Sequence, residues 1–520
     1  MIHLGDVIYE TRADDFQTAI DEQFRPIALT NPDGQPRAIA PFPSGGGTRA
    51  GTNFAKTVED YRHLYRTFLS DPEMQAVRAR WPFVQIWDDH EFTDDSWQSQ
   101  SNYTNTGSLD EGDQARKLAA SQAWFEYIPA HLSGAPGVPG VDGEAQDFTP
   151  ADVQDAPFTA PDADNFVDEP NNTAAIGAMT IYRSLRFGKH VELVMTDERS
   201  YRSDHAIPEE LTNNQLFFDP RAALPLPIVN VFDQGRTANG GSPPASVLGL
   251  PNARAASPPG TMLGARQKAW WKATMKGSDA TWKLWGNEVM LARVALQQIP
   301  PTQPFDRVLT GDAWDGYPTE RAELLSYLRD EKILNVVSLA GDIHATFASV
   351  LVDNFDATSP ASPQPVACEL TAAGISSNSL FSFFEGASRG LPAGLRGLLL
   401  VDASAAGGAA FTENFNLWLR HGTNAAGTFY ATKNLAMALE AADVSVNPYL
   451  RYVDTNSQGY GYAKVTAAQI EASLVVIDRP IKPTPAGGPG IKRTANVVVP
   501  KDNPAGMTVT VTGQKPFPLT

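Results

Sequence analysis

A dense group of charged side chains follows one apolar segment of this sequence. Residues 81–87 (WPFVQIW) predict a short buried strand, and five carboxylates and one imidazole follow within eight residues: Asp88, Asp89, His90, Glu91, Asp94 and Asp95. Carboxylates this close together repel one another, so burying them unpaired would cost on the order of several kcal/mol. The functional interpretation is a centre for two or more metal ions, built from oxygen ligands and one imidazole. The alternative is a solvated acidic loop in which Asp94 or Asp95 caps a following helix.

Two other segments also combine an apolar run with an aspartate at its end. Near the start, Asp6 follows an apolar approach and a glycine, and Tyr9 stands three residues further on. Residues 333–340 form a nearly continuous apolar run, typical of a parallel strand buried on both faces, and a GDIH motif follows at residues 341–344. In open α/β sheets ligands bind beyond the carboxyl ends of the strands, so we expect these three ends to converge on one crevice.

The residue types at these ends indicate how metal ions would be held. Asp6 has enough lone pairs to bridge two cations. Asp342 and His344 stand at i and i+2, so both would lie on one side of a strand end and bind the same centre. Tyr9 would bind as a phenolate only to a strongly acidic metal such as ferric iron, and would otherwise be a hydrogen-bonding phenol. The predicted metal ligands are Asp6, Tyr9, Asp89, Asp94 or Asp95, Asp342 and His344.

A centre of this kind has the groups needed to hydrolyse a phosphate ester. Two metal ions would polarise the phosphoryl oxygens and turn a water into hydroxide for in-line attack. His90 is the best candidate to protonate the leaving alkoxide. A non-catalytic calcium-binding module would explain the acids, but it would not need Tyr9, His90 and His344 after strand-like runs. A glycosidase with paired carboxylates is a third alternative, although the sequence does not separate a general acid from a nucleophile.

These motifs resemble those of the PhoD-like alkaline phosphatases and phosphodiesterases, a branch of the calcineurin-like metallophosphoesterases. The resemblance rests on GDVIY at residues 5–9, WDDHE at 87–91 and GDIH at 341–344. Longer segments agree with it, at residues 196–202, 262–267, 285–290 and 312–317. The resemblance runs from residue 1 to about residue 478. It implies an α/β fold, a metallophosphoesterase-type β-sandwich of mixed sheets flanked by helices.

The resemblance also implies cofactors and a phosphate contact. PhoD-like enzymes use Fe3+ and Ca2+, and an arginine in a helix comparable to residues 110–128 contacts phosphate, which corresponds to Arg116 here. The alternative for Arg116 is a solvated helical side chain. The family carries an iron-binding cysteine before its first motif, whereas this chain begins two residues before His3 and its one cysteine is Cys368. We therefore expect weak iron affinity and a catalytic domain without its first strand, so a catalytically impaired fragment is the main alternative function.

Composition limits the classes of partner. The net charge of -18 argues against a nucleic-acid surface, because phosphate backbones select clusters of Lys and Arg. No run approaches 18 uncharged apolar residues, so we expect no membrane span. The expected partner is a small phosphate-ester substrate, and the sequence does not indicate an oligomeric state. The resemblance implies that the parent protein is exported to the periplasm or secreted, although this chain contains no signal peptide of its own.

The expected organisation is one catalytic domain over residues 1–478 and a Pro/Gly-rich tail over 479–520. Two segments without helical or strand periodicity, near 133–173 and 203–260, are predicted to be loop insertions that shape access to the site. The tail is predicted to be a linker or a partly ordered arm. Asp197, Arg199 and Arg202 are expected to form a local ion-pair network, and Cys368 is expected to be a buried, inert thiol.

Overall fold

The computed structural model describes most of the chain. The described residues are 1–12, 27–30, 38–49, 52–101, 111–130, 145–212, 216, 221–299, 304–356, 363–402, 411–483 and 487–519. Among them, no helix combines the length and the apolar character needed to cross a membrane.

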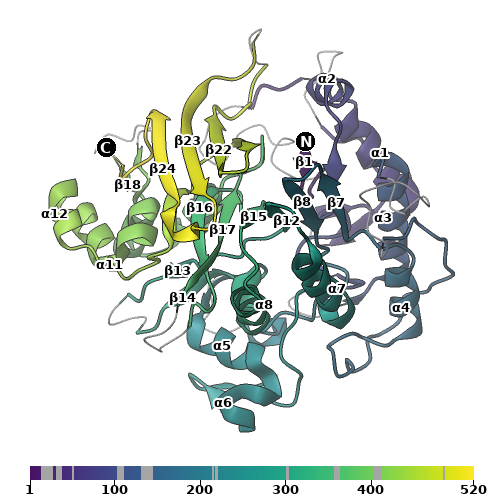
Figure 1. Cartoon of the computed structure of the whole chain (residues 1–520). Helices are drawn as coiled ribbons and strands as arrows, with labels where there is room; N and C mark the ends of the chain where they lie inside the picture. The colour runs from purple at the N-terminus through teal and green to yellow at the C-terminus, as the bar shows by residue number, and fades with distance from the viewer. Residues whose placement is uncertain are drawn as a thin grey trace.

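A seven-stranded mixed sheet forms the centre of the molecule (Figure 1). The four strands β17, β15, β12 and β8 run parallel, and β20, β16 and β7 add antiparallel pairs at the two sides. β12 and β15 are almost fully buried because both faces of the sheet are covered, which explains their apolar sequences. In spatial order the strands are β20 (Leu450–Asp454), β16 (Thr346–Val352), β17 (Pro365–Thr371), β15 (Val336–Ala340), β12 (Trp282–Gly286), β8 (Val191–Met195) and β7 (Arg183–Phe187).

Helices α7 (Gly264–Gly277) and α8 (Pro318–Asp330) connect successive parallel strands and cover one face of the sheet. Parallel strands need such crossover connections, because a tight turn cannot reverse the chain between them. Trp271 of α7 packs on Trp285 of β12 with ring centroids 4.6 Å apart. In Figure 1 these two helices lie below the central strands.

The other face of the sheet packs against a four-stranded antiparallel sheet and two helices. Val350 and Cys368 of the large sheet share a core with Ala472 and Val497 of the small one. The two sheets therefore form the expected β-sandwich of mixed sheets flanked by helices, and Cys368 is buried within it. The elements on this face are β21 (Gly459–Val465), β22 (Gln469–Ile477), β23 (Ile491–Pro500), β24 (Thr508–Gly513), α1 (Val58–Leu69) and α3 (Gln114–Tyr127).

The C-terminal segment differs from the expected linker. β23 and β24 continue the small sheet, and β23 alternates buried and partly exposed positions along its whole length. Ala495, Val497 and Val499 face the core, as the period of two in a strand requires. The high Pro and Gly content of residues 480–506 lies mainly in the connections before β23 and after it, and this composition concealed the alternating strand.

The segments predicted as loop insertions contain regular structure in their described parts. The first includes α4 (Pro170–Gly177), and the second includes β9 (Ala222–Pro225) and α5 (Leu226–Gln234). β9 pairs with β14 (Arg307–Thr310), and β13 (Ala295–Leu296) completes this sheet. These elements are stabilised by partners distant in sequence, so local periodicity does not reveal them.

The remaining elements are short strand pairs and helices at the periphery. They are α2 (Pro72–Arg80), α6 (Ala238–Gly241), α9 (Leu380–Ser388), α10 (Ala393–Leu399), α11 (Asn414–Thr432), α12 (Leu435–Glu440), and the pairs β2 (Gly47–Arg49) with β3 (Thr52–Phe54), β5 (Gln100–Ser101) with β6 (Glu111–Gly112), β10 (Ser246–Val247) with β11 (Leu250–Pro251), and β18 (Val401–Asp402) with β19 (Phe411–Thr412).

Candidate metal centre

Two short parallel strands bring the first two motifs together. β1 (Ile2–His3) pairs with β4 (Val84–Gln85), so Asp6 and Asp88 follow neighbouring strand ends. Among the described strands, β1 and β4 bond only to each other. They form a separate two-stranded sheet and do not join the seven-stranded sheet. Gly5 has a φ of 111°, and a Cβ on it would lie 2.3 Å from the Cβ of Asp88. Only glycine combines this backbone conformation with so close an approach.

Glu91 fastens the two motif loops to each other. Its carboxylate accepts hydrogen bonds from the backbone N–H groups of Asp6 at 2.9 Å, Val7 at 2.7 Å and Asp88 at 2.9 Å. Burial raises the pKa of Glu91 to about 7, although these three donors act in the opposite direction. Glu91 therefore positions the loops, a role that spacing in the sequence did not indicate.

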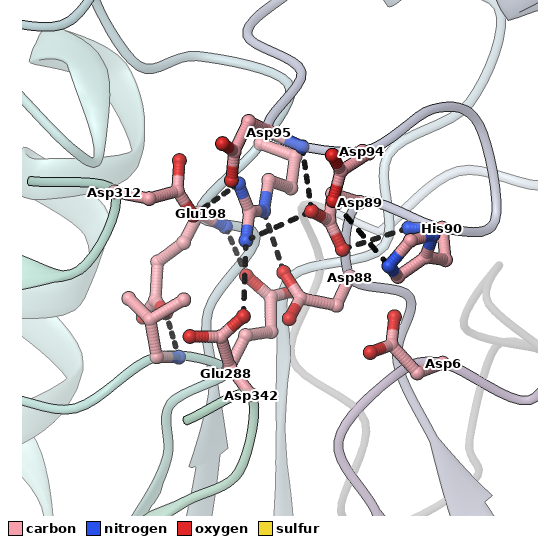
Figure 2. A network of polar contacts seen from close by, with 12 residues as sticks. Asp6, Asp88, Asp89, His90, Asp94, Asp95, Glu198, Glu288, Asp312 and Asp342 are labelled. Carbon is pink, nitrogen blue, oxygen red and sulfur yellow. Dashed lines mark hydrogen bonds and ion pairs between the residues drawn. The ribbon is translucent and has the colours of Figure 1, made fainter. Parts of the chain in front are cut away.

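Asp89 lies at the centre of the gathered acids. Its carboxylate belongs to three groups whose ligand atoms lie within 4.8 Å of one another: Asp6, Asp89 and His90; Asp88, Asp89 and Asp342; and Asp89, Asp95 and Asp312. Figure 2 shows these side chains around a common region, with Asp6 and His90 on one side and Asp312 on the other. The predicted convergence of the three motifs is therefore present.

Asp312 was not predicted as a site residue, although its sequence follows the same rule as the motifs. Strand β14 ends at Thr310, and a glycine and Asp312 follow it. The carboxylate of Asp312 also accepts from His205 Nε2 at 2.7 Å. The repeated order of strand, glycine and aspartate was the signal that could have identified this residue.

The guanidinium of Arg199 lies among these carboxylates. Its Nε is 2.5 Å from Asp88 and its Nη1 is 2.8 Å from Asp312, while Nη2 lies 3.8 Å from both Asp89 and Asp342. Arg199 was expected to pair locally with Asp197, but its partners come from three distant segments. Burial alone raises the pKa of Asp89, yet the charges of Arg199 and His90 outweigh it and lower that pKa.

His90 is held on two sides. Its Nδ1 lies 2.6 Å from the carboxylate of Glu10, which has no exposed surface, and its ring packs on Tyr9 with centroids 4.0 Å apart. The other nitrogen, Nε2, lies 3.5 Å from Asp94. Burial lowers the pKa of His90, but the charges of Asp89 and Glu10 outweigh it and raise that pKa well above its usual value.

Tyr9 and His344 meet at the edge of this cluster. The Tyr9 hydroxyl is 3.2 Å from Nε2 of His344, and Nδ1 of His344 is 2.7 Å from the backbone carbonyl of Asn378. Burial lowers the pKa of His344 to about 4, so the ring is neutral and donates from Nδ1 to the carbonyl. This leaves the Nε2 lone pair directed toward Tyr9, the arrangement that a metal-ligating histidine requires.

The backbone directs Asp342 and His344 to different parts of the cluster. β15 ends at Ala340, and the two residues have φ values of 60° and 54°, so the i and i+2 rule for strands does not apply. Asp342 groups with Asp88 and Asp89, and no described group contains both Asp342 and His344. Asp6 and Asp95 also have positive φ, at 57° and 51°. A left-handed conformation costs about 1–2 kcal/mol at a non-glycine residue, and its concentration here is typical of a functional site.

Arg116 lies beside the loop of the acidic motif and donates hydrogen bonds to it. Its Nε donates to the Tyr61 hydroxyl at 2.9 Å, and its other nitrogens donate to Asp113 and to the backbone carbonyl of Phe92, both at 3.2 Å. The side chain is buried, so the solvated alternative does not hold. These contacts assign Arg116 to positioning the loop at Phe92, and its contact with phosphate stays a prediction.

The donor set fits metal ions, most clearly at Asp6 and Asp89. Oδ1 of Asp6 is buried and has no hydrogen-bond partner among the described residues. Burial raises the pKa of Asp6 well above its usual value. A cation would relieve both penalties, because it supplies the partner that the buried oxygen lacks and favours the ionised form.

The family to which the chain belongs follows from a comparison with family profiles. A profile described as PhoD-like phosphatase matches residues 1–391. The chain belongs to this family. The PhoD-like chain is 25% identical over 307 residues to alkaline phosphatase D of Bacillus subtilis (strain 168), over 58% of this chain and 38% of that relative. The PhoD-like chain thus spans well under half the length of this relative.

A solved structure described as the structure of PhoD has the same fold. It superposes on this PhoD-like chain with a TM-score of 0.56 at 19% sequence identity, over 99% of this chain and 67% of that one.

Proposed function

We propose that this protein hydrolyses phosphate esters with the help of metal ions held by the clustered carboxylates. The observation that carries the proposal is the position of Asp89, whose carboxylate belongs to three ligand groups at once. A carboxylate shared in this way can bridge neighbouring cations. Membership of the PhoD-like phosphatase family supports the same reaction class.

The proposed cations are Ca2+ and an iron ion at different parts of the cluster. Groups of carboxylate oxygens such as Asp88, Asp89 and Asp342 suit Ca2+, a hard cation that prefers oxygen. The pair of Tyr9 and His344 offers the phenol and imidazole that suit Fe3+. Cys368 lies in the core between the sheets and cannot add a thiolate, so we propose Ca2+ as the better held ion. Bound cations supply the Lewis acidity that polarises a phosphoryl oxygen and acidifies a water.

His90 is proposed as the general acid, and Glu10 as the residue that positions it. The 2.6 Å contact between Nδ1 and Glu10 fixes the ring orientation and favours the doubly protonated ring, so Nε2 with its proton faces the cluster. The ring contact with Tyr9 removes the remaining rotational freedom. A proton held on Nε2 can then pass to the oxygen of the departing alcohol. Arg199 supplies a fixed positive charge beside the same acids, which offsets their repulsion when an anionic substrate binds.

Asp89→Asn provides the test. The full chain is loaded with Ca2+ and iron, its metal content is measured, and turnover of p-nitrophenyl phosphate and bis-p-nitrophenyl phosphate is followed. We expect the variant to lose metal and at least 100-fold in kcat/KM, whereas Asp279→Asn, whose side chain is 91% exposed, keeps both. A wild-type protein that binds Ca2+ but hydrolyses neither ester would favour a non-catalytic calcium-binding module. Export of the parent protein stays a prediction.

A further inference from the structure

A cavity lies apart from the predicted metal ligands, between the two segments predicted as insertions. Its volume is about 170 Å³, and none of the predicted metal ligands lines it. Phe158 comes from the first segment and Phe232, Asp233 and Gly260 from the second or its end, while Trp97 follows the acidic motif. An apolar cavity of roughly 150 Å³ accepts benzene, so this space suits a small organic molecule.

Aromatic rings form one part of the wall. Trp97 and Phe158 meet edge to face with ring centroids 5.2 Å apart, and Phe232 is 1% exposed. The face of an aromatic ring carries negative electrostatic potential and attracts a cation, most strongly when water is excluded. This wall therefore accepts either an apolar group or an organic cation.

The carboxylates of Asp233 and Asp204 indicate which of these two ligands the cavity prefers. Asp233 is 1% exposed, and its Oδ2 accepts from the backbone N–H of Thr319 at 2.7 Å, while Oδ1 has no hydrogen-bond partner among the described residues. A Cβ at position 260 would lie 2.2 Å from this Oδ1, so only glycine fits beside the oxygen. Oδ1 of Asp204, which also lines the cavity, likewise has no hydrogen-bond partner among the described residues and lies 3.9 Å from Nδ1 of His205. Buried oxygens in this state favour a ligand that donates hydrogen bonds.

The charges of the cavity point to a cation rather than a neutral donor. The guanidinium of Arg254 is paired with Asp204 and also donates to the backbone carbonyl of His205 at 2.7 Å. Asp233 forms no ion pair among the described residues, although the charge of Arg321 acts on it from a distance. With Asp233 ionised, the lining residues Asp204, Asp233 and Arg254 carry a net negative charge. An ammonium group would supply both the missing donor and the missing charge.

We propose that this cavity binds a small organic ammonium ion, with its N–H groups directed to Asp233 and Asp204 and its apolar body against Trp97 and Phe158. The site is independent of phosphate-ester hydrolysis. It recognises a primary or secondary ammonium better than a quaternary one, because only the former can donate to the two free oxygens.

The test compares benzylammonium with benzyl alcohol, which has nearly the same shape but no charge. Calorimetric titration of the Ca2+-saturated full chain is carried out at pH 8, because burial raises the pKa of Asp233 to about 7 and its carboxyl is then ionised. We expect benzylammonium to bind at least tenfold more tightly than benzyl alcohol, and benzyltrimethylammonium to bind more weakly than benzylammonium. Asp233→Asn should remove the preference for the charged ligand, and Phe158→Leu should weaken both ligands.

Asp279→Asn is the matched control, because this acidic side chain is 91% exposed and lies outside the cavity. Thermal melting of each variant confirms folding, and the half-buried Phe158 gives a second variant if Asp233→Asn is unstable. Equal binding of benzylammonium and benzyl alcohol would overturn the proposal in favour of a purely apolar cavity. No binding of either ligand would also overturn it, as would benzylammonium binding that Asp233→Asn leaves unchanged, which would place the cation at the metal centre.

Discussion

The guanidinium of Arg199 lies 2.5 Å from the carboxylate of Asp88, and both side chains are almost fully buried. This pair joins the acidic motif after β4 to the segment after β8, which are 111 residues apart. A fixed positive charge is thereby built in among the carboxylates of the cluster. Two of the ligand groups, those with Asp342 and with Asp312, are also in contact with this guanidinium.

Arg199→Gln should therefore destabilise the protein strongly. Removing the cation leaves the buried carboxylate of Asp88 without its ion-pair partner, a loss of about 3–5 kcal/mol, whereas Asp312 keeps Arg202. Saturating Ca2+ should restore part of it, because the ion can occupy the same acids. Urea unfolding with and without Ca2+ measures both effects. Arg62→Gln is the control, since Arg62 forms partly exposed ion pairs worth about 0–1 kcal/mol. Equal losses in the two variants would refute a central role for Arg199.

Gly5→Ala should disrupt the metal centre, because the added Cβ meets Asp88 and the φ of 111° is strained for alanine. We expect a loss of about 1–3 kcal/mol and reduced metal content. Gly177→Ala is the matched control: no atom lies within 4 Å of its added Cβ, and its helical position tolerates alanine. Melting temperatures and metal analysis of the two variants give the comparison. A Gly5 variant with normal metal content would contradict the close packing of the two loops.

Glu10→Gln should slow the reaction according to the leaving group. If Glu10 orients His90 as the general acid, phenyl phosphate hydrolysis should fall roughly 10- to 100-fold, because its leaving group needs a proton. Hydrolysis of p-nitrophenyl phosphate should fall less than about threefold, since p-nitrophenolate leaves without one.

Glu91→Gln is the control for this experiment, because Glu91 contacts backbone N–H groups of both loops and should slow the two esters equally. Metal content is measured in both variants. Equal slowing by Glu10→Gln, or loss of metal from that variant, would instead make Glu10 a support for His90 as a metal ligand.

Glu369 should make stability depend on pH. Burial raises its pKa to about 7 although it accepts from the backbone N–H groups of Leu291 and Ala292. Between the ordinary glutamate pKa of 4.5 and about 7, the folded protein keeps the Glu369 proton and the unfolded chain releases it. The contribution of Glu369 to folding stability is therefore complete below pH 4.5 and is lost as the pH rises through 7. The span corresponds to a few kcal/mol, at about 1.4 kcal/mol per pKa unit.

Glu369→Gln should flatten the corresponding part of the pH profile, measured by urea unfolding in EDTA between pH 4.5 and 8. The exposed Glu73→Gln should leave the slope as in the wild type. An unchanged slope in the Glu369 variant would show that other groups cause the dependence.

Val497→Ala tests whether the C-terminal strands belong to the core. Val497 is 1% exposed in β23 and faces the large sheet, so we expect a loss of about 1.5–3 kcal/mol. Val444→Ala changes a side chain that is 80% exposed and should alter stability by less than about 0.5 kcal/mol. Chemical unfolding compares the two. A negligible effect of Val497→Ala would restore the earlier expectation of a linker.

The amino-acid sequence by itself determined the chemistry and the class of fold. Apolar runs that end in Asp6, Asp88 and Asp342 predicted strands that deliver acids to one place, because this pattern depends only on local periodicity and residue type. The same local information failed for the C-terminal strands, where Pro and Gly in the connections hid an alternating pattern.

Only the tertiary structure decided which side chains neutralise, position and separate these acids. Arg199 and Asp312 reach the cluster from segments far from the motifs, and Glu10 and Glu91 act through contacts that span 80 residues or more. Positive φ values at Asp342 and His344 then direct two residues of one motif to different neighbours. The physical reason is that charge pairing and hydrogen bonding depend on distance in space, and a single sequence records only distance along the chain.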